Sequence, residues 1–136
     1  QTVTKAIQSV PGIIGVNNHQ GSKATADKRV MRTVLNVVKS HNLFFVDSRT
    51  SSQSVAFDTS RQMGIRTGEN ELFLDNSNDV AYIKGRLRTA MQMALQHGSV
   101  TVIGHARMNT ATAIREMIPE MEAAGIKLVF ESQMVR

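Results

Sequence analysis

Apolar and polar positions alternate in blocks along this chain. A short apolar run at 12–17 leads into a polar loop, and residues 26–41 then carry apolar side chains every three or four positions. That spacing is typical of a helix with one buried face. Residues 43–46 are all apolar, which predicts a short buried strand after the helix. The opening of the chain therefore predicts a strand–helix–strand unit, preceded by the end of a helix over residues 1–9.

The same order recurs three more times. Each recurrence has a helical segment that closes on glycine, as the first helix closes on Asn42, and both residue types tolerate a left-handed backbone. The expected helices are 52–64, 79–98 and 110–125. A strand candidate follows each helix: Ile65 after the first, 100–103 after the second and 126–130 after the third. The first candidate is irregular, because residues 66–71 separate Ile65 from the apolar segment 72–74.

Strands that alternate with helices predict parallel strands joined by right-handed crossovers. We therefore expect an α/β fold in a single domain over residues 1–136. The pattern by itself leaves open whether the strands form part of a barrel or an open sheet.

Composition narrows the classes of function. No apolar run reaches the length of a membrane span, and the first residues lack the apolar region of a signal peptide. The absence of cysteine excludes disulfides, thiolate metal sites and cysteine nucleophiles. The net charge of +5 permits an acidic partner, but one Tyr, five Phe and no Trp argue against a stacking surface for nucleic acid.

Polar side chains gather where the expected strands end. Parallel strands bring their carboxyl ends to one edge of a sheet, which is where ligands and chemistry collect in α/β proteins. We therefore expect these clusters to converge on one rim. They are Asn17, Asn18 and His19; Asp47, Ser48 and Arg49; Asp75 and Asn76; and His105 with Arg107.

Each of these residues also has a structural alternative. The His19 ring could satisfy backbone groups of its own loop, and Asp47 could cap the next helix or pair with Arg49. Asp75 and its neighbour are expected to cap the helix that begins near residue 79. The loop at 21–23 also allows a looser anion site, although its lysine is misplaced for a phosphate-binding P-loop.

Five blocks of the chain, in order, resemble the divergent polysaccharide deacetylases of the NodB-like superfamily. Residues 15–22 resemble the family signature G-V-N-N-H-M-G-S. The later matching blocks are 43–50, 73–76, 102–105 and the stretch from 119 to 129. The resemblance covers nearly the whole chain and implies part of a distorted (β/α) barrel.

The resemblance also implies a reaction: metal-dependent removal of an acetyl group from a polysaccharide, commonly with zinc. The metal would polarise the acetyl carbonyl, a carboxylate would take a proton from water, and a histidine would protonate the leaving amine. Mapped onto this sequence, the implied metal ligand is His19, the catalytic residues are His105, Asp47 and Arg49, and the substrate-binding residues are Asn17, Asn18 and Asp75.

Two departures from the family pattern affect this assignment. The family domain opens with adjacent acidic residues, and this sequence has no Asp-Asp pair. Gln20 stands where the family often has Met, and Ala106-Arg107 follows His105 where many members carry Pro-His. The chain therefore resembles the carboxyl-terminal portion of a family domain that lacks its first βα units.

Two hypotheses of different classes follow. The first is a deacetylase-like hydrolase acting on acetylated polysaccharide or cell-wall glycan, with weak or absent catalysis because the acidic pair is missing. The second is a non-catalytic carbohydrate-binding or scaffolding module that kept the fold. Open strand edges in a partial barrel predict self-association. The family resemblance implies a location outside the cytoplasm, either extracellular, periplasmic or in the cell envelope.

Overall fold

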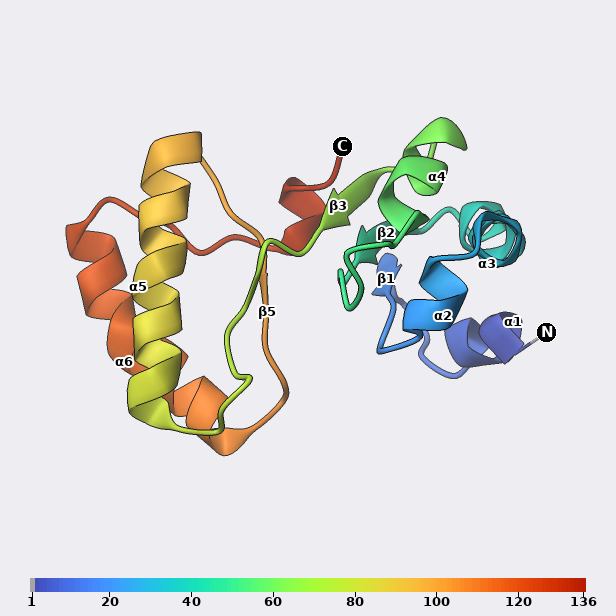
Figure 1. The fold of residues 1–136 in the computed structure, drawn as a ribbon. Coiled ribbons are helices and arrows are strands. Elements are labelled where there is room, and N and C mark those ends of the chain that lie inside the picture. The colour runs from blue at the N-terminus through green and yellow to red at the C-terminus, as the bar shows by residue number, and fades with distance from the viewer. Residues whose placement is uncertain (1) are drawn as a thin grey trace. The chain divides into compact units, whose positions relative to one another are not determined.

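The computed structural model describes residues 2–136, and the chain divides into two compact units. The first unit contains residues up to 69 together with 130–136, and the second contains residues 70–129 (Figure 1). Each unit is described by itself below.

A three-stranded parallel sheet forms the centre of the first unit. Its strand order is β1-β2-β3, and the register places Val16 beside Phe45 and Phe45 beside Thr67. The elements of this unit are α1 (Thr2–Gln8), β1 (Gly15–Asn17), α2 (Ser22–Thr25), α3 (Lys28–Ser40), β2 (Phe44–Asp47), α4 (Ala56–Gln62), β3 (Thr67–Glu69) and the 3-10 helix η1 (Glu131–Gln133).

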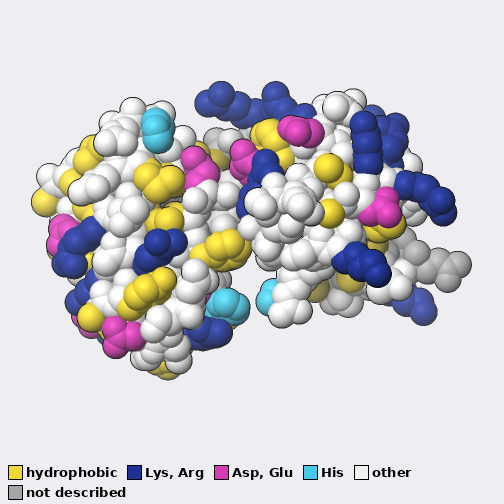
Figure 2. Space-filling model, viewed as in Figure 1, with side chains coloured by type: hydrophobic (Ala, Val, Ile, Leu, Met, Phe, Trp, Pro, Cys, Tyr) yellow, Lys and Arg dark blue, Asp and Glu magenta, His cyan; other side chains and the backbone are white. Residues whose placement is uncertain are grey.

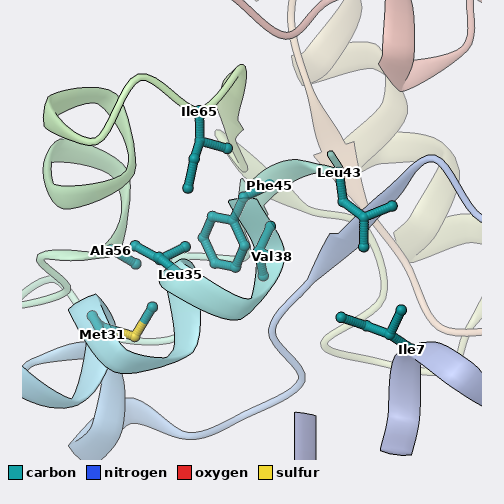
Figure 3. Packing of buried hydrophobic residues seen from close by; sticks show 8 residues of the cluster. All are labelled: Ile7, Met31, Leu35, Val38, Leu43, Phe45, Ala56 and Ile65. Atoms are coloured by element: carbon teal, nitrogen blue, oxygen red, sulfur yellow. The ribbon is translucent and has the colours of Figure 1, made fainter. Parts of the chain in front are cut away.

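Helix α3 supplies most of the apolar core of this unit. Its buried face carries Met31, Leu35 and Val38, which cluster with Phe45 of β2 and Ile65 (Figure 3). Burial of side chains of this size contributes roughly 1.5–3 kcal/mol each, so the periodic apolar face explains why this segment packs on the sheet.

Local signals fix both ends of α3. The side chain of Asp27 accepts hydrogen bonds from the backbone N–H groups of Arg29 and Val30, which caps the helix and separates it from α2. Asn42 follows the helix with φ of +55°, the left-handed conformation that the sequence predicts. The helix therefore begins two residues later than expected and ends one residue earlier.

The second unit pairs two parallel strands with two helices. Its elements are β4 (Leu72–Phe73), α5 (Val80–His97), β5 (Val102–Ile103) and α6 (Met108–Ala123). Leu72 pairs with Val102, and Ile83 and Met117 bury the faces of α5 and α6 in a second core. Lys84 also forms an ion pair with a glutamate of α6 at 2.6 Å between Nζ and Oε1.

The expected α/β class with parallel strands is confirmed, but three details differ. The strands form two sheets, β1-β2-β3 in the first unit and β4-β5 in the second. Thr67–Glu69, expected to interrupt the pattern, forms β3 because it pairs with β2. Residues 126–130, expected as a strand, form none because they pair with neither sheet, and Leu128 and Phe130 are exposed.

Charge is divided unequally between the units. The first unit contains ten basic and five acidic residues, whereas the second contains six of each. Figure 2 shows Lys and Arg side chains spread over the unit that carries α1–α4. The net positive charge therefore belongs to the first unit. Among residues 2–136, no helix is long and apolar enough to cross a membrane.

Candidate functional site

Side chains of Asn17, Asn18 and Ser48 hold together the loops that follow β1 and β2. Asn17 Nδ2 donates to Ser48 Oγ at 3.0 Å, and the backbone N–H of Ser48 donates to Asn18 Oδ1 at 2.8 Å. Ser48 Oγ donates to the backbone oxygen of Asn18 at 2.5 Å. We call these three residues the loop clamp. The geometry gives both amides a structural task, and their role in substrate binding stays a prediction.

His19 follows the loop clamp directly, on an exposed turn. Gln20 and Gly21 both have left-handed backbones, with φ of +57° and +77°. The backbone oxygen of Gln20 accepts hydrogen bonds from Asn18 Nδ2 at 3.1 Å and from Thr50 Oγ1 at 3.4 Å. A non-glycine residue in this region is strained by about 1–3 kcal/mol and persists only where its surroundings hold it. The clamp and these bonds therefore fix the turn that carries His19.

A cavity of about 530 Å³ lies against this loop within the first unit. Residues 17–21 line it together with aliphatic side chains from α1, β1 and α3. Those side chains include Val3, Ile7, Val16, Met31 and Val34. The size and mostly apolar lining, with a few polar groups of the His19 loop, are typical of a ligand pocket.

Asp47 ends β2 and is fully buried, with 0% of its surface exposed. Its Oδ1 accepts from the backbone N–H of Arg49 at 2.9 Å. Its Oδ2 accepts from Ser54 Oγ at 2.8 Å and from the backbone N–H of Phe57 at 3.3 Å. Both carboxylate oxygens are thus used to shape the turn between β2 and α4, as the structural alternative expects. The assignment of Asp47 as a catalytic residue stays a prediction.

Arg49 joins the ends of β2 and β3 through Glu69. Its Nε and Nη2 both lie within hydrogen-bonding distance of Glu69 Oε2, at 2.6 and 2.5 Å. Arg49 itself has φ of +53°, and its Nε is 3.7 Å from Asp47 Oδ2. Sequence reasoning missed Glu69 because residues 66–71 lack a strand pattern. The register of β3 reveals this residue, because it pairs Glu69 with Asp47 of β2.

In the second unit, Asp75 and His105 form a hydrogen-bonded pair at the carboxyl ends of β4 and β5. His105 Nδ1 is 2.9 Å from Asp75 Oδ1, and the backbone N–H of His105 donates to Asp75 Oδ2 at 2.7 Å. Asp75 is buried, whereas 49% of the His105 side chain is exposed. The pair therefore presents an oriented imidazole at the surface of this unit.

Thr110 completes the surroundings of Asp75. Its hydroxyl donates to Asp75 Oδ2 at 2.6 Å. Burial by itself raises the pKa of the Asp75 carboxyl, but the hydrogen bonds from Thr110 and His105 outweigh it and hold that pKa below its ordinary value. Asp75 is therefore ionised at neutral pH. Sequence reasoning missed Thr110 because a threonine in the first turn of a helix carries no catalytic signal.

The expectation that Asp75 caps the following helix is wrong. Asp79 caps α5 instead, since its side chain accepts from the backbone N–H of Tyr82 at 2.8 Å. Arg107, on the loop of His105, donates from Nη1 to the backbone oxygen of Asp75 at 3.3 Å. Asp75 is thus committed to His105 and its loop, and its role in binding substrate stays a prediction.

The predicted site residues fall into two groups, one in each unit. Asn17, Asn18, Asp47 and Arg49 lie on the joined loops of the first unit together with His19. Asp75 and His105 contact each other in the second. Within residues 2–136, no three His, Asp or Glu side chains lie close enough together to hold a metal ion.

Comparison with known proteins identifies a family and individual relatives of this chain. Residues 1–135 match the divergent polysaccharide deacetylase family. An uncharacterised protein of Haemophilus influenzae is 39% identical over 113 residues, which cover 83% of this chain and 40% of that protein. The uncharacterised protein YibQ of Escherichia coli is 31% identical over 116 residues, which cover 85% of this chain and 36% of YibQ.

The fold also resembles a solved structure. The crystal structure of an uncharacterised protein from Agrobacterium tumefaciens has a TM-score of 0.85 and 24% identity, and the match covers 90% of this chain and 50% of that chain. The chain spans about two fifths of the length of the curated relatives. Because the family match extends over nearly every residue, the chain belongs to the divergent polysaccharide deacetylase family.

Proposed function

We propose that this chain provides part of a carbohydrate deacetylase that hydrolyses the C–N bond of acetamido groups on a polysaccharide. Two observations support the proposal: membership of the deacetylase family and the Asp75–His105 pair. The pair carries the argument, because it gives an exposed imidazole a fixed orientation and a fixed protonation pattern.

The chemistry of the pair follows from the charge on Asp75. An ionised carboxylate can only accept hydrogen bonds, so the proton between the two side chains lies on His105 Nδ1. Nε2, which faces away from Asp75, is then the nitrogen that can exchange a proton with substrate. An amide nitrogen leaves poorly without a proton, and a general acid that supplies one accelerates the reaction by about 10²–10⁴-fold. We assign this role to His105.

In the first unit, we propose that the loop clamp holds His19 as a ligand for a divalent metal, zinc by family resemblance. Imidazole is a common zinc ligand. A zinc site needs at least three protein donors, however, and residues 2–136 contain no such group. The described residues therefore do not form a complete metal site, and the further ligands would come from outside them. The ion pair of Arg49 and Glu69 would lie near the loops of the clamp, at the ends of β2 and β3.

The substrate class and location of the whole protein rest on the family. We propose an acetylated polysaccharide or cell-wall glycan as the partner, and action in the periplasm or at the cell envelope. The net positive charge of the first unit favours glycans that carry acidic groups.

Acetate release tests the proposal directly. The chain is incubated with a β-1,4-linked oligomer of N-acetylglucosamine and zinc, and free acetate is measured. We expect slow release that His105→Gln reduces about 10²-fold or more. His97→Gln is the matched control, because His97 is an exposed histidine in the last turn of α5 and should tolerate the change. Equal release by the wild-type and His105→Gln chains would contradict the role of His105.

Zinc titration by calorimetry tests His19 separately. We expect His19→Ala to weaken zinc binding, whereas His41→Ala should leave it unchanged. His41 is a suitable control because it is an exposed histidine of the same unit and its Nδ1 lies 2.9 Å from the backbone oxygen of Val37. Equal affinity in both variants would remove His19 as a ligand.

The second candidate function is a carbohydrate-binding or scaffolding module without catalysis. Within residues 2–136 the absence of a three-donor metal group favours it, as do the structural tasks of Asn17, Asn18 and Asp47. Saturable binding of the same oligomer with no acetate release would support this candidate against the first.

A further inference from the structure

Thr110, in the first turn of α6, contacts Asp75 of the Asp75–His105 pair. Only 3% of its surface is exposed, and its Oγ1 is 2.6 Å from Asp75 Oδ2. A threonine hydroxyl can donate or accept, but an ionised carboxylate only accepts, so Thr110 donates this bond. A buried donor aimed at a buried charge is a specific arrangement, because an unpaired polar group in either place would be destabilising.

The hydroxyl completes the set of donors around the carboxylate. Oδ1 receives His105 Nδ1, while Oδ2 receives the backbone N–H of His105 and the Thr110 hydroxyl. Charge-assisted bonds of this kind are about twice as strong as neutral ones. Removing the hydroxyl would leave Oδ2 with a single donor and would loosen the orientation of the carboxylate toward the ring.

The methyl group of Thr110 lies close to Gly104, the residue before His105. A Cβ placed on Gly104 would come within 3.0 Å of Thr110 Cγ2 and 3.5 Å of Asp75 Oδ2. The backbone just before His105 can therefore approach Thr110 closely only because residue 104 is glycine. Thr110 thus donates to the carboxylate through its hydroxyl, while its methyl lies beside Gly104, the residue that precedes His105.

We propose that Thr110 is a positioning residue, which holds the Asp75 carboxylate in line with the His105 ring so that His105 carries its proton on Nδ1 and directs Nε2 to substrate. The substrate-directed part of this inference rests on the proposed deacetylase function. Two cations face the same region from neighbouring elements: Arg107 donates to the backbone oxygen of Asp75, and Arg86 Nε of α5 donates to the backbone oxygen of Phe73 at 2.9 Å. Both arginines donate to backbone oxygens, so neither replaces the bond from the Thr110 hydroxyl to the Asp75 carboxylate.

Two substitutions separate the functions of the side chain. Thr110→Val keeps the branched shape and removes the hydroxyl, whereas Thr110→Ser keeps the hydroxyl and removes the methyl. Nuclear magnetic resonance gives two readouts: the ¹³C shift of the Asp75 carboxyl followed against pH, and the ¹⁵N shifts of the His105 ring at about pH 8.5, where imidazole is neutral. Neither readout requires glycan or metal.

We expect Thr110→Val to raise the pKa of the Asp75 carboxyl and to mix the two tautomers of His105. Thr110→Ser should keep the wild-type carboxyl titration and a single tautomer with its proton on Nδ1. Unchanged spectra in Thr110→Val, or equal changes in both variants, would overturn the proposal.

A measurement on the unmodified chain covers the case in which Thr110→Val does not fold. The hydroxyl proton of Thr110 should exchange slowly with water at neutral pH and faster once Asp75 is protonated, and fast exchange throughout would overturn the proposal. If acetate release fails while these signals are present, the deacetylase function is lost but the link from Thr110 to Asp75 remains. If activity is found, Thr110→Val should lower kcat with little change in KM, and Thr110→Ser should restore it.

Discussion

Replacing Asp47 with Asn tests whether this buried carboxylate is a structural centre of the first unit. The change keeps the size of the side chain but turns one oxygen into an NH₂ donor. Every neighbour of Asp47 is a donor: the backbone N–H groups of Arg49 and Phe57 and the hydroxyl of Ser54. The Ser54 hydroxyl can rotate to accept from the amide, but the two backbone N–H groups cannot.

The magnitude follows from counting these bonds. Oδ1 accepts from the backbone N–H of Arg49, and Oδ2 accepts from that of Phe57. In either orientation, the NH₂ group of an asparagine would therefore point at one of these two N–H donors, and that hydrogen bond would be lost. Loss of a hydrogen bond to a charged acceptor costs about 1.5–3 kcal/mol. The Arg49 guanidinium is partly exposed, so its ion pair with Asp47 adds little. We therefore expect Asp47→Asn to lower the free energy of unfolding by about 2–3 kcal/mol.

Urea unfolding followed by circular dichroism measures this change. With a slope of about 2 kcal/mol per molar urea, the midpoint should fall by about 1 M. Asp58→Asn is the matched control, because Asp58 is exposed in the first turn of α4 and should cost less than about 1 kcal/mol through the helix dipole. Hydrogen exchange should show lost protection around residues 54–57 in Asp47→Asn alone.

One result would refute this reasoning. If Asp47→Asn unfolds at the wild-type urea midpoint but abolishes acetate release, the carboxylate acts in the chemistry and its hydrogen bonds are not needed for stability. An equal fall of the midpoint in the Asp58→Asn control would instead show that any loss of charge on this unit is destabilising.

Three further results are expected. The pKa of the Asp75 carboxyl is lower in the folded chain than in the unfolded chain. The stabilisation from this carboxylate is therefore present above about pH 4 and is lost as the pH falls through the lowered pKa. In thermal melts, Asp75→Asn should lower stability at pH 7 and flatten this acid-dependent loss. Ser48→Ala removes the hydroxyl of the loop clamp, which should cost about 1–3 kcal/mol and speed hydrogen exchange over residues 17–21. Because β1 is an edge strand, the chain should self-associate, which sedimentation velocity measures. Ile14→Lys, just before β1, should weaken the association. Leu95→Lys is the control and should not, although Leu95 is 61% exposed and Ile14 62%.

The helix ends could be predicted from the sequence because capping is local. Asn42, Gly64, Gly98 and Gly125 all have positive φ where the pattern placed the ends of helices. A residue that tolerates the left-handed region acts within one turn of its own helix, so neighbouring residues carry the whole signal. Helix α3 begins two residues later than the apolar periodicity predicts, because Asp27 caps it.

Part of the candidate site could also be predicted. The sequence placed Asp75 and His105 at the ends of strands, and they lie in contact because β4 and β5 pair in parallel. It could not supply Glu69 or Thr110 as partners, since each contacts the site from an element distant in sequence.

The sequence by itself determined the α/β class, the approximate positions of the longer helices and the family. Only the tertiary structure decided that the strands form two sheets, that Thr67–Glu69 is a strand, and that Asp47 has both oxygens occupied. The physical reason is the range of the interactions. Helix periodicity and capping act over a few residues, whereas strand pairing and the saturation of a buried carboxylate depend on groups that meet only when the chain has folded.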